Sequence, residues 1–312
     1  MSVRSPRLQP SRAQWLRHLA SRRKKLAPGP VEKVAFVLSG GGPLGALQVG
    51  AMKAMFEHGI VPELVVGTSV GALNAAFIAF DPTQQGSVKL ESAWRALANE
   101  DLFPTSRLRA PWTKFLMRGD RVFENTGIRR IVIGGLGHVM FEDAHIPLAV
   151  VGADLETGDE RIFTSGAVLP ALLASTALPG VYPPVVIDGH QYIDGGVANN
   201  VPVAPALAMG ASTVYVLDTT AVNHRRRDLI RPLDYLMHAF TLSRGSRYRV
   251  ELPLLQAGAR VIPIPVPRLD FHVPLASLEY SARLIEIAYE AADRFLSGTG
   301  SGDIPPKVTS LG

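Results

Sequence analysis

The sequence predicts an α/β fold in which parallel strands alternate with helices, and three features near its start predict it. Val34 to Leu38 is a run of five apolar residues, as expected for a parallel strand buried on both faces. A glycine-rich turn follows at residues 39–45 and leads into a helical segment that ends at Gly59. A second short strand, at residues 63–66, is soon followed by the apolar helix of residues 72–79.

The turns after these two strands are expected to lie at one edge of the sheet. Two parallel strands joined by a right-handed helical crossover usually pair, so their carboxyl ends meet. The second turn is Gly67-Thr68-Ser69-Val70-Gly71, the G-x-S-x-G pattern at a strand-to-helix turn. Glycines on both sides of Ser69 let the backbone bend sharply, which exposes the hydroxyl as a candidate nucleophile.

The first turn brings several glycine amides to the start of a helix, at Gly40, Gly41, Gly42 and Gly45. Successive backbone N–H groups in such a turn form a cluster of donors that holds negative charge. An ester carbonyl attacked by Ser69 develops a negative charge, which preorganised donors stabilise. The two turns therefore predict one shared site for acyl transfer.

Two nucleotide-binding motifs are alternative interpretations of the same glycines. Gly40-x-Gly42-x-x-Gly45 also fits the dinucleotide fingerprint, which needs an acidic residue about 20 residues further on, at the end of the second strand. Gly67-Thr68-Ser69 occupies that place, which argues against a dinucleotide. A Walker phosphate loop fails too, because no Gly-Lys-Ser or Gly-Lys-Thr follows the glycines.

A serine nucleophile needs a base, and Asp194 is the candidate. It follows a predicted hairpin in which residues 185–187 turn at residues 188–190 into residues 191–193. Gly195 and Gly196 come next, so the backbone at this point can approach another loop closely. An ordinary Asp-Gly turn without a catalytic role is the alternative interpretation.

In this order the motifs resemble the patatin-like phospholipase family. The similar segments are Gly40-Gly41-Gly42-x-x-Gly45, Gly67-Thr68-Ser69-Val70-Gly71, residues 174–184 and Asp194-Gly195-Gly196. The resemblance covers about residues 34–218 and implies a three-layer α/β/α sandwich with a mainly parallel central sheet. It also implies a lipid acyl hydrolase of the phospholipase A or lysophospholipase type, acting on phospholipid or another lipid acyl ester through an acyl-enzyme.

The resemblance also assigns roles to residues. Ser69 and Asp194 would form a catalytic dyad without histidine, and Gly40, Gly41 and Gly42 would form the oxyanion hole. Gly45, Gly67, Gly71, Gly195 and Gly196 complete the motifs. No metal or cofactor is implied, and no EF-hand pattern contradicts independence from calcium.

Leu44 departs from the family pattern, which commonly has Arg or Lys two residues after the third glycine. A missing cation leaves the backbone donors intact but removes positive field from the oxyanion hole. Two alternatives stay open, the first because of Leu44 and the basic N-terminal residues, and the second because Ser, Asp and His occur in the chain order of a conventional hydrolase triad. One is a non-catalytic lipid-binding protein of the same fold, and the other is a soluble carboxylesterase with a Ser69-Asp218-His272 triad. His190 is expected to face solvent.

The basic residues are concentrated at the N-terminus. Residues 1–30 contain eight Lys and Arg and no acidic residue, whereas the whole chain has 32 Lys and Arg against 27 Asp and Glu. We expect a flexible basic tail at 1–30, a catalytic domain at 31–297 and a flexible C-terminal tail at 298–312. The N-terminal tail either contacts an anionic membrane surface as an amphipathic helix or stays disordered. Nucleic acid is not an expected partner, since no recognition motif accompanies the charge.

Composition limits the remaining possibilities. The chain has no Cys, which excludes disulfides and thiol nucleophiles. No apolar run reaches 18 residues, and no signal-peptide core follows the N-terminal charges. The sequence thus predicts a cytoplasmic protein, with or without peripheral membrane contact.

The rest of the chain predicts further elements. Helices are expected at 84–98, with Val88, Leu90, Trp94 and Leu97 inward, and at 128–133, 167–174, 202–209, 228–249 and 276–296, the last with Leu284, Ile287, Ala288, Ala291 and Phe295 on its packing face. Strands are expected at 147–153, 161–163, 213–217 and 261–264. Residues 103–121 form a surface helix or a lid. The acidic hairpin tip at 154–160 is a solvated turn or, as an alternative, a metal site.

Overall fold

The structure, a computed structural model, describes residues 33–99, 124–221, 248, 250–253, 255–256, 258–271, 273–274 and 277–298. The segment at 103–121, most of the helix expected at 228–249, His272, the expected N-terminal tail and residues 299–312 of the expected C-terminal tail lie outside these residues. The described residues belong to one compact unit that begins at Lys33.

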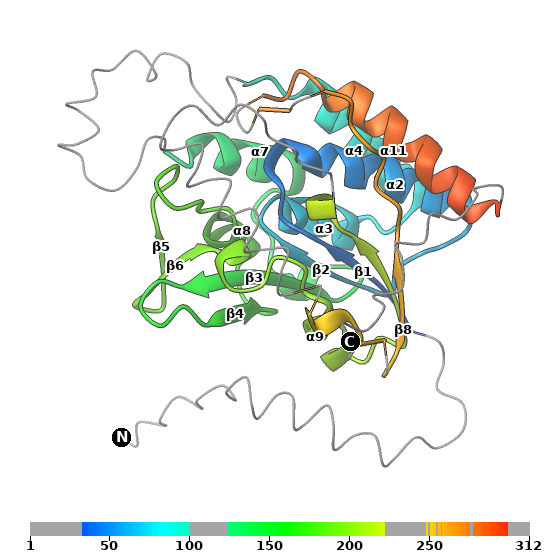
Figure 1. Cartoon of the computed structure of the whole chain (residues 1–312). Helices are drawn as coiled ribbons and strands as arrows, with labels where there is room; N and C mark the ends of the chain where they lie inside the picture. Colours follow the sequence, from blue (N-terminus) through cyan, green and yellow to red (C-terminus); the bar gives the residue numbers. More distant parts are fainter. Residues whose placement is uncertain are drawn as a thin grey trace, which may run out of the picture. The chain divides into compact units, whose positions relative to one another are not determined.

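These residues form an eight-stranded mixed sheet in the order β5-β6-β3-β2-β1-β7-β8, with β4 also paired to β3 (Figure 1). The parallel strands are β1 (Val34–Leu38), β2 (Leu64–Thr68), β3 (Leu148–Asp154), β7 (Thr213–Leu217) and β8 (Arg260–Pro263). The antiparallel strands are β4 (Glu160–Phe163), β5 (Val185–Ile187) and β6 (His190–Asp194). The predicted α/β class with a mainly parallel sheet is confirmed.

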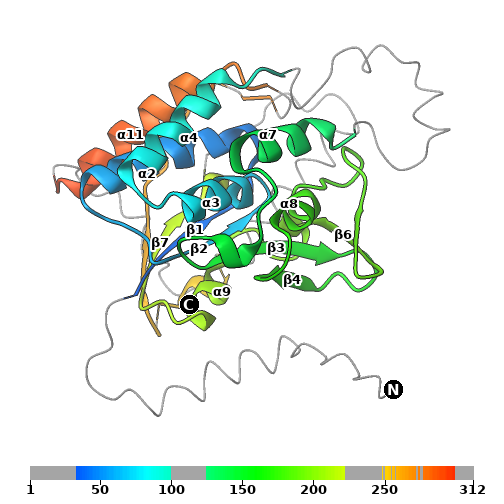
Figure 2. The same cartoon turned by 180° about the vertical axis from the view of Figure 1, so that it is seen from behind.

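Helices cover both faces of the sheet, as Figures 1 and 2 show from opposite sides. One face carries α2 (Gly45–Glu57), α3 (Val70–Phe80), α4 (Gln84–Ala96), α7 (Thr126–Leu136), α8 (Val168–Ser175) and α11 (Ser281–Leu296). The other face carries α9 (Val203–Ala208). Phe36 and Leu38 of β1 enter the first core, whereas Ala35 and Val37 enter the second. A strand buried in this way on both faces reads as a continuous apolar run.

Three details of the helices differ from the prediction. α7 runs through Gly134 and Gly135 and ends at Gly137, whose φ of 78° is the left-handed conformation that favours glycine. Val88 is 37% exposed, because it lies 200° around the helix from the buried Leu90. Phe295 is exposed in the last turn of α11, whose buried face consists of Ser281, Leu284, Ile285, Ala288 and Ala292.

Candidate active site

The two predicted turns lie next to each other at the carboxyl edge of the sheet. β1 and β2 pair in parallel, and their register sets Leu38 opposite Gly67. The first turn leaves β1 at Ser39 and enters α2 through a short 3-10 helix, Gly42–Leu44. The second turn leaves β2 and enters α3 directly after Ser69. One parallel strand pair therefore brings both glycine turns to one site.

Ser69 has a backbone conformation that residues other than glycine rarely adopt, with φ 55° and ψ −127°. Its amide donates to Ser175 Oγ at 2.9 Å, and that hydroxyl donates to the carbonyl of Val151 at 2.6 Å. Close backbone packing around the turn demands glycine on either side. A Cβ on Gly67 would lie 2.3 Å from the carbonyl oxygen of Gly71, and a Cβ on Gly71 would lie 2.4 Å from that of Leu38. This is the geometry of a strand-to-helix nucleophile turn.

Asp194 is the last residue of β6, which pairs with β3, the neighbour of β2 in the sheet. Ser69 Oγ donates to Asp194 Oδ2 at 2.6 Å, and the amide of Gly196 donates to Oδ1 at 2.7 Å. Asp194 is 1% exposed and Ser69 is 9% exposed. Gly195 is required here because a Cβ would lie 2.1 Å from the carbonyl oxygen of Val151. A buried carboxylate within hydrogen-bond reach of a serine hydroxyl is positioned to take its proton.

The glycine turn runs beside Ser69. A Cβ on Gly40 would lie 3.0 Å from Cβ of Ser69. The amide of Gly40 donates to the carbonyl of Asn200 at 3.3 Å. The amides of Gly41 and Gly42 donate to no partner among the described residues. Within the described part of the chain, two donors of the turn thus remain available to a ligand.

Leu44 is buried in the apolar core of the first face, at 7% exposure. The residue that replaces the basic side chain common in the family therefore acts as a packing residue. Leu44 directly precedes α2 and belongs to the same core cluster as that helix.

Of the alternative triad, the structure describes Ser69 and Asp218 but not His272, so the triad stays a hypothesis. Asp218 lies at the end of β7, and its Oδ1 accepts from the amide and the hydroxyl of Thr220 at 2.8 and 2.6 Å. Burial, together with the negative charge of Asp218, raises the pKa of the Tyr248 hydroxyl. His272 lies outside the described residues, and His190 is exposed, as expected.

The acidic hairpin tip is organised by its own backbone. Asp154 Oδ1 accepts from the amides of Glu156 and Thr157 at 2.9 and 3.1 Å, as in a solvated turn. Within the ranges that the structure describes, no group of three or more His, Asp or Glu side chains is arranged to hold a metal ion. No helix in those ranges has the length and apolar character needed to cross a bilayer.

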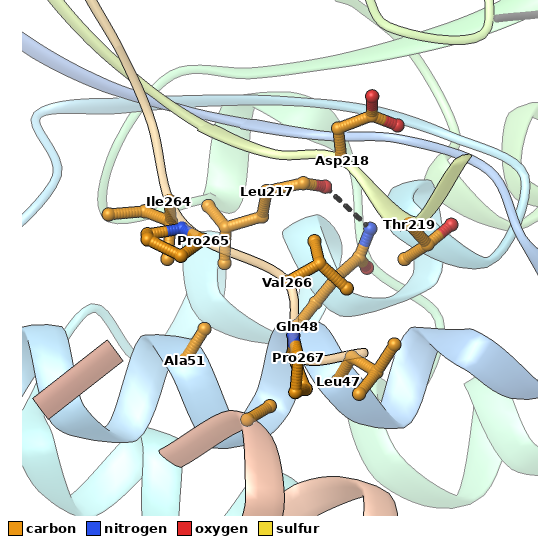
Figure 3. A pocket seen from close by; sticks show the side chains of 11 residues that line it. Leu47, Gln48, Ala51, Leu217, Asp218, Thr219, Ile264, Pro265, Val266 and Pro267 are labelled. Atoms are coloured by element: carbon orange, nitrogen blue, oxygen red, sulfur yellow. Dashed lines mark hydrogen bonds between the residues drawn. The ribbon is translucent and has the colours of Figure 1, made fainter. Parts of the chain in front are cut away.

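Several buried side chains that the motifs did not point to support the glycine turn. Thr219, Asn200 and Gln48 each donate to a carbonyl of residues 39–40, at 2.9, 3.3 and 2.7 Å respectively. Figure 3 shows Gln48 and Thr219 at a small pocket between α2 and residues 264–267, where Gln48 also donates to the carbonyl of Leu217 at 3.1 Å. The pocket has neither Ser69 nor Asp194 in its lining. Sequence offered one weak signal for Thr219, its place just beyond the end of a predicted strand.

Comparison with known proteins gives curated relatives that match over more than half of this chain. The chain is 30% identical over 187 residues to human patatin-like phospholipase domain-containing protein 6, which covers 59% of this chain and 13% of that protein. It is also 30% identical over 213 residues to lysophospholipase NTE1 of Eremothecium gossypii, covering 65% of this chain and 13% of that protein. The chain thus spans about an eighth of the length of these curated relatives.

Solved structures with a similar course of the chain include VipD from Legionella pneumophila, with a TM-score of 0.49 at 15% identity, covering 86% of this chain and 67% of that one. Human GIVD cytosolic phospholipase A2 gives a TM-score of 0.44 at 11% identity, covering 91% of this chain and 61% of that one. The sequence profile described as patatin-like phospholipase matches residues 36–207, which include Ser69, Asp194 and both glycine turns. By that match over more than half of its length, the chain belongs to the patatin-like phospholipase family.

Proposed function

We propose that this protein is a serine hydrolase that cleaves carboxylic esters of lipids, with Ser69 as nucleophile and Asp194 as base. The observation that carries the proposal is the 2.6 Å hydrogen bond from Ser69 Oγ to Asp194 Oδ2, beside a turn with two available amides. Family membership supports a lipid ester as substrate, of the phospholipase or lysophospholipase class. Phospholipid is therefore the first substrate to test.

The reaction has two steps. Asp194 takes the hydroxyl proton while Ser69 Oγ attacks the carbonyl carbon, and the resulting oxyanion lies against the glycine turn. When the ester bond breaks, Asp194 returns the proton to the leaving alcohol and an acyl-enzyme remains. Water then attacks the acyl group with Asp194 again as base, which releases the carboxylic acid and regenerates Ser69.

Of the three glycines, Gly41 and Gly42 are the proposed oxyanion donors. The amide of Gly40 already donates to the carbonyl of Asn200, so it is not counted as an oxyanion donor. Glycine is needed at this position because there is no room for a side chain. Its Cα lies where any Cβ would crowd Ser69 and Asn200. The amide of Gly196, by holding Asp194 Oδ1, leaves Oδ2 to the nucleophile. In this scheme the field of the hole comes from backbone dipoles, without a cation at position 44.

A fluorophosphonate probe tests the dyad, because it phosphonylates only an activated serine. We expect wild-type protein to label, and Ser69→Ala and Asp194→Asn to lose labelling and at least about 1000-fold of the ester turnover. Asp218→Asn and His272→Ala serve as controls and should label like wild type. Loss of labelling in His272→Ala with retention in Asp194→Asn would favour the triad. A wild-type protein that neither labels nor hydrolyses esters would leave the non-catalytic lipid-binding hypothesis in its place.

The same wild-type protein distinguishes lipid from soluble esters. Phospholipid vesicles should be hydrolysed faster, per ester at equal concentration, than short-chain esters in free solution. Adding anionic lipid should raise the rate on vesicles, because residues 1–30 carry eight basic and no acidic side chains. Replacing four of these basic residues by Gln should remove the increase without changing turnover of the soluble ester. A faster rate on soluble esters would instead favour the carboxylesterase.

A further inference from the structure

We propose that Thr219 is a positioning residue for the oxyanion hole, which fixes the direction of the Gly41 N–H group by holding the carbonyl of Gly40. This inference rests on the proposed function, because it concerns the same site. Thr219 lies 150 residues beyond the nucleophile in sequence and belongs to none of the motifs. It follows β7, the parallel neighbour of β1.

Two buried hydrogen bonds tie Thr219 to the turn. Thr219 Oγ1 donates to the carbonyl of Gly40 at 2.9 Å, and the amide of Thr219 donates to Ser39 Oγ at 2.8 Å. Thr219 is 2% exposed and Ser39 is fully buried, so water does not compete for these groups. Asn200 Nδ2 is a second, longer donor to the same carbonyl, at 3.3 Å. The carbonyl of Gly40 is therefore held by two side chains that come from distant parts of the sequence.

Holding a carbonyl also fixes the next amide. A trans peptide is planar, and its C=O and N–H point in opposite directions. With the Gly40 oxygen bonded to Thr219 and Asn200, the N–H of Gly41 in the same peptide must point away from them. The next peptide is fixed likewise, since the carbonyl of Gly41 accepts from the amide of Leu44 at 3.3 Å, which directs the N–H of Gly42. Both available donors thus have a defined direction before any substrate binds.

Gly41 and Thr219 are also packed directly against each other. A Cβ on Gly41 would lie 2.0 Å from Thr219 Oγ1, so the turn backbone rests directly on the threonine. Gln48 of α2 supports the turn, because its Nε2 donates to the carbonyl of Ser39, the first residue after β1. The same Nε2 donates to the carbonyl of Leu217, the last residue of β7 (Figure 3). The strand ends that carry Ser39 and Thr219 are thereby held together.

A donor with the right direction matters most when the oxyanion forms, so the loss of Thr219 Oγ1 should reduce kcat more than it raises KM. We expect Thr219→Val, which keeps the shape and removes the hydroxyl, to lower kcat about 10-fold to 100-fold with KM within about threefold. Thr219→Ser keeps the donor and should restore at least a third of the wild-type kcat. Thr220→Val is the matched control, because the hydroxyl of Thr220 bonds to Asp218 and not to the turn.

The experiment measures kcat and KM of the full chain on a soluble ester, and the affinity of a trifluoromethyl ketone that forms a tetrahedral adduct on Ser69. For Thr219→Val the inhibitor should weaken by the same factor as kcat/KM, while Thr220→Val stays at wild-type values. Wild-type kcat and inhibitor affinity in Thr219→Val would overturn the proposal, as would an equal loss in Thr220→Val. If Thr219→Val does not fold, Ser39→Ala, which removes the acceptor of the Thr219 amide, should lower kcat at least threefold, and an unchanged kcat would overturn the proposal. Failure of the proposed function looks different, since the wild-type protein itself would then show no turnover.

Discussion

The two turns at the edge of the sheet lie side by side, yet they are held in different ways. The turn at residues 67–71, called the nucleophile turn after the role proposed for Ser69, is fixed mainly by backbone contacts, since Gly67 and Gly71 leave no room for a Cβ against neighbouring main chain. One side chain, Ser175, also accepts from the Ser69 amide. The turn at residues 39–45, called the oxyanion turn after the role proposed for it, is fixed mainly by side chains that donate to its carbonyls, from Gln48, Asn200 and Thr219. Backbone contacts need glycine at set spacing, whereas side-chain tethers can come from anywhere in the chain.

The two turns also differ in backbone strain. Ser69 is held at φ 55°, a conformation that costs a non-glycine residue about 1–3 kcal/mol. In the oxyanion turn the left-handed residue is Gly42, at φ 58°, which adopts this conformation at no steric cost. The nucleophile turn therefore depends on its packing to persist, and the oxyanion turn depends on its hydrogen bonds.

Substitution of Gly71 by Ala should have the largest effect. The new Cβ would lie 2.4 and 2.5 Å from the carbonyl oxygens of Leu38 and Ser39, which are main-chain atoms that cannot rotate away. We expect a loss of at least about 4 kcal/mol in the free energy of unfolding, measured with urea, and no ester turnover. Gly134→Ala in α7 is the control, because nothing lies within 4 Å of its Cβ position. It should leave stability unchanged or raise it by up to about 1 kcal/mol. Equal stabilities for the two variants would contradict the backbone account of the nucleophile turn.

The same contrast explains what could be predicted from sequence. Ser69 and its flanking glycines form a short local motif, so the sharp strand-to-helix turn that carries this serine was predictable. Asp194 was predictable as a candidate because Asp-Gly-Gly is again a local pattern, although its 2.6 Å contact with Ser69 depends on the pairing of β6 with β3. The contacts of Thr219 with the glycine turn were not predictable, since they arise from the pairing of β7 with β1 and join residues about 180 positions apart.

Helix faces and ends were predicted with similar limits. The spacing of Leu90 and Trp94 correctly gave the buried face of α4, but apolar character alone wrongly turned Val88 inward. Gly134 and Gly135 suggested an end for α7, although glycine within a helix costs only about 1 kcal/mol, which packing compensates. Such choices are decided by tertiary contacts.

Substitution of Gln48 by Leu should have the next largest effect and tests the side-chain tethers. Gln48 is buried, donates to the carbonyls of Ser39 and Leu217, and accepts from Asn74 Nδ2 at 2.9 Å. Leucine has a similar volume but leaves these groups short of partners, which should lower the free energy of unfolding by about 2–4 kcal/mol. Gln84→Leu, at the exposed start of α4, should change it by less than about 0.5 kcal/mol in the same urea titration. If Gln48→Leu also falls within that limit, the turn is not tethered through this side chain.

Substitution of Trp94 by Phe should have the smallest effect on the free energy of unfolding. It removes one hydrogen bond of the network that also contains Asn74 and Gln48, at the residue farthest from the glycine turn. Trp94 Nε1 donates to Asn74 Oδ1 at 2.8 Å, and Asn74 Nδ2 donates in turn to Gln48 Oε1 at 2.9 Å and to the carbonyl of Gly45 at 3.1 Å. Loss of Trp94 Nε1 removes the donor to the buried Asn74 Oδ1, so the free energy of unfolding should fall by about 1–2 kcal/mol, while kcat changes less than about twofold. Val88→Ala, on the exposed face of the same helix, should cost less than about 0.5 kcal/mol.

The combination of Trp94→Phe with Gln48→Leu shows whether these residues act as one tether. Residues in one hydrogen-bond network have non-additive effects, so the double variant should lose at least about 0.5 kcal/mol less than the sum of the two single losses. The reason is that Asn74, once released by either change, has less left to lose from the other. Additive losses would mean that Trp94 and Gln48 stabilise the fold independently. The oxyanion turn would then be held by Gln48, Thr219 and Asn200 without support from α4.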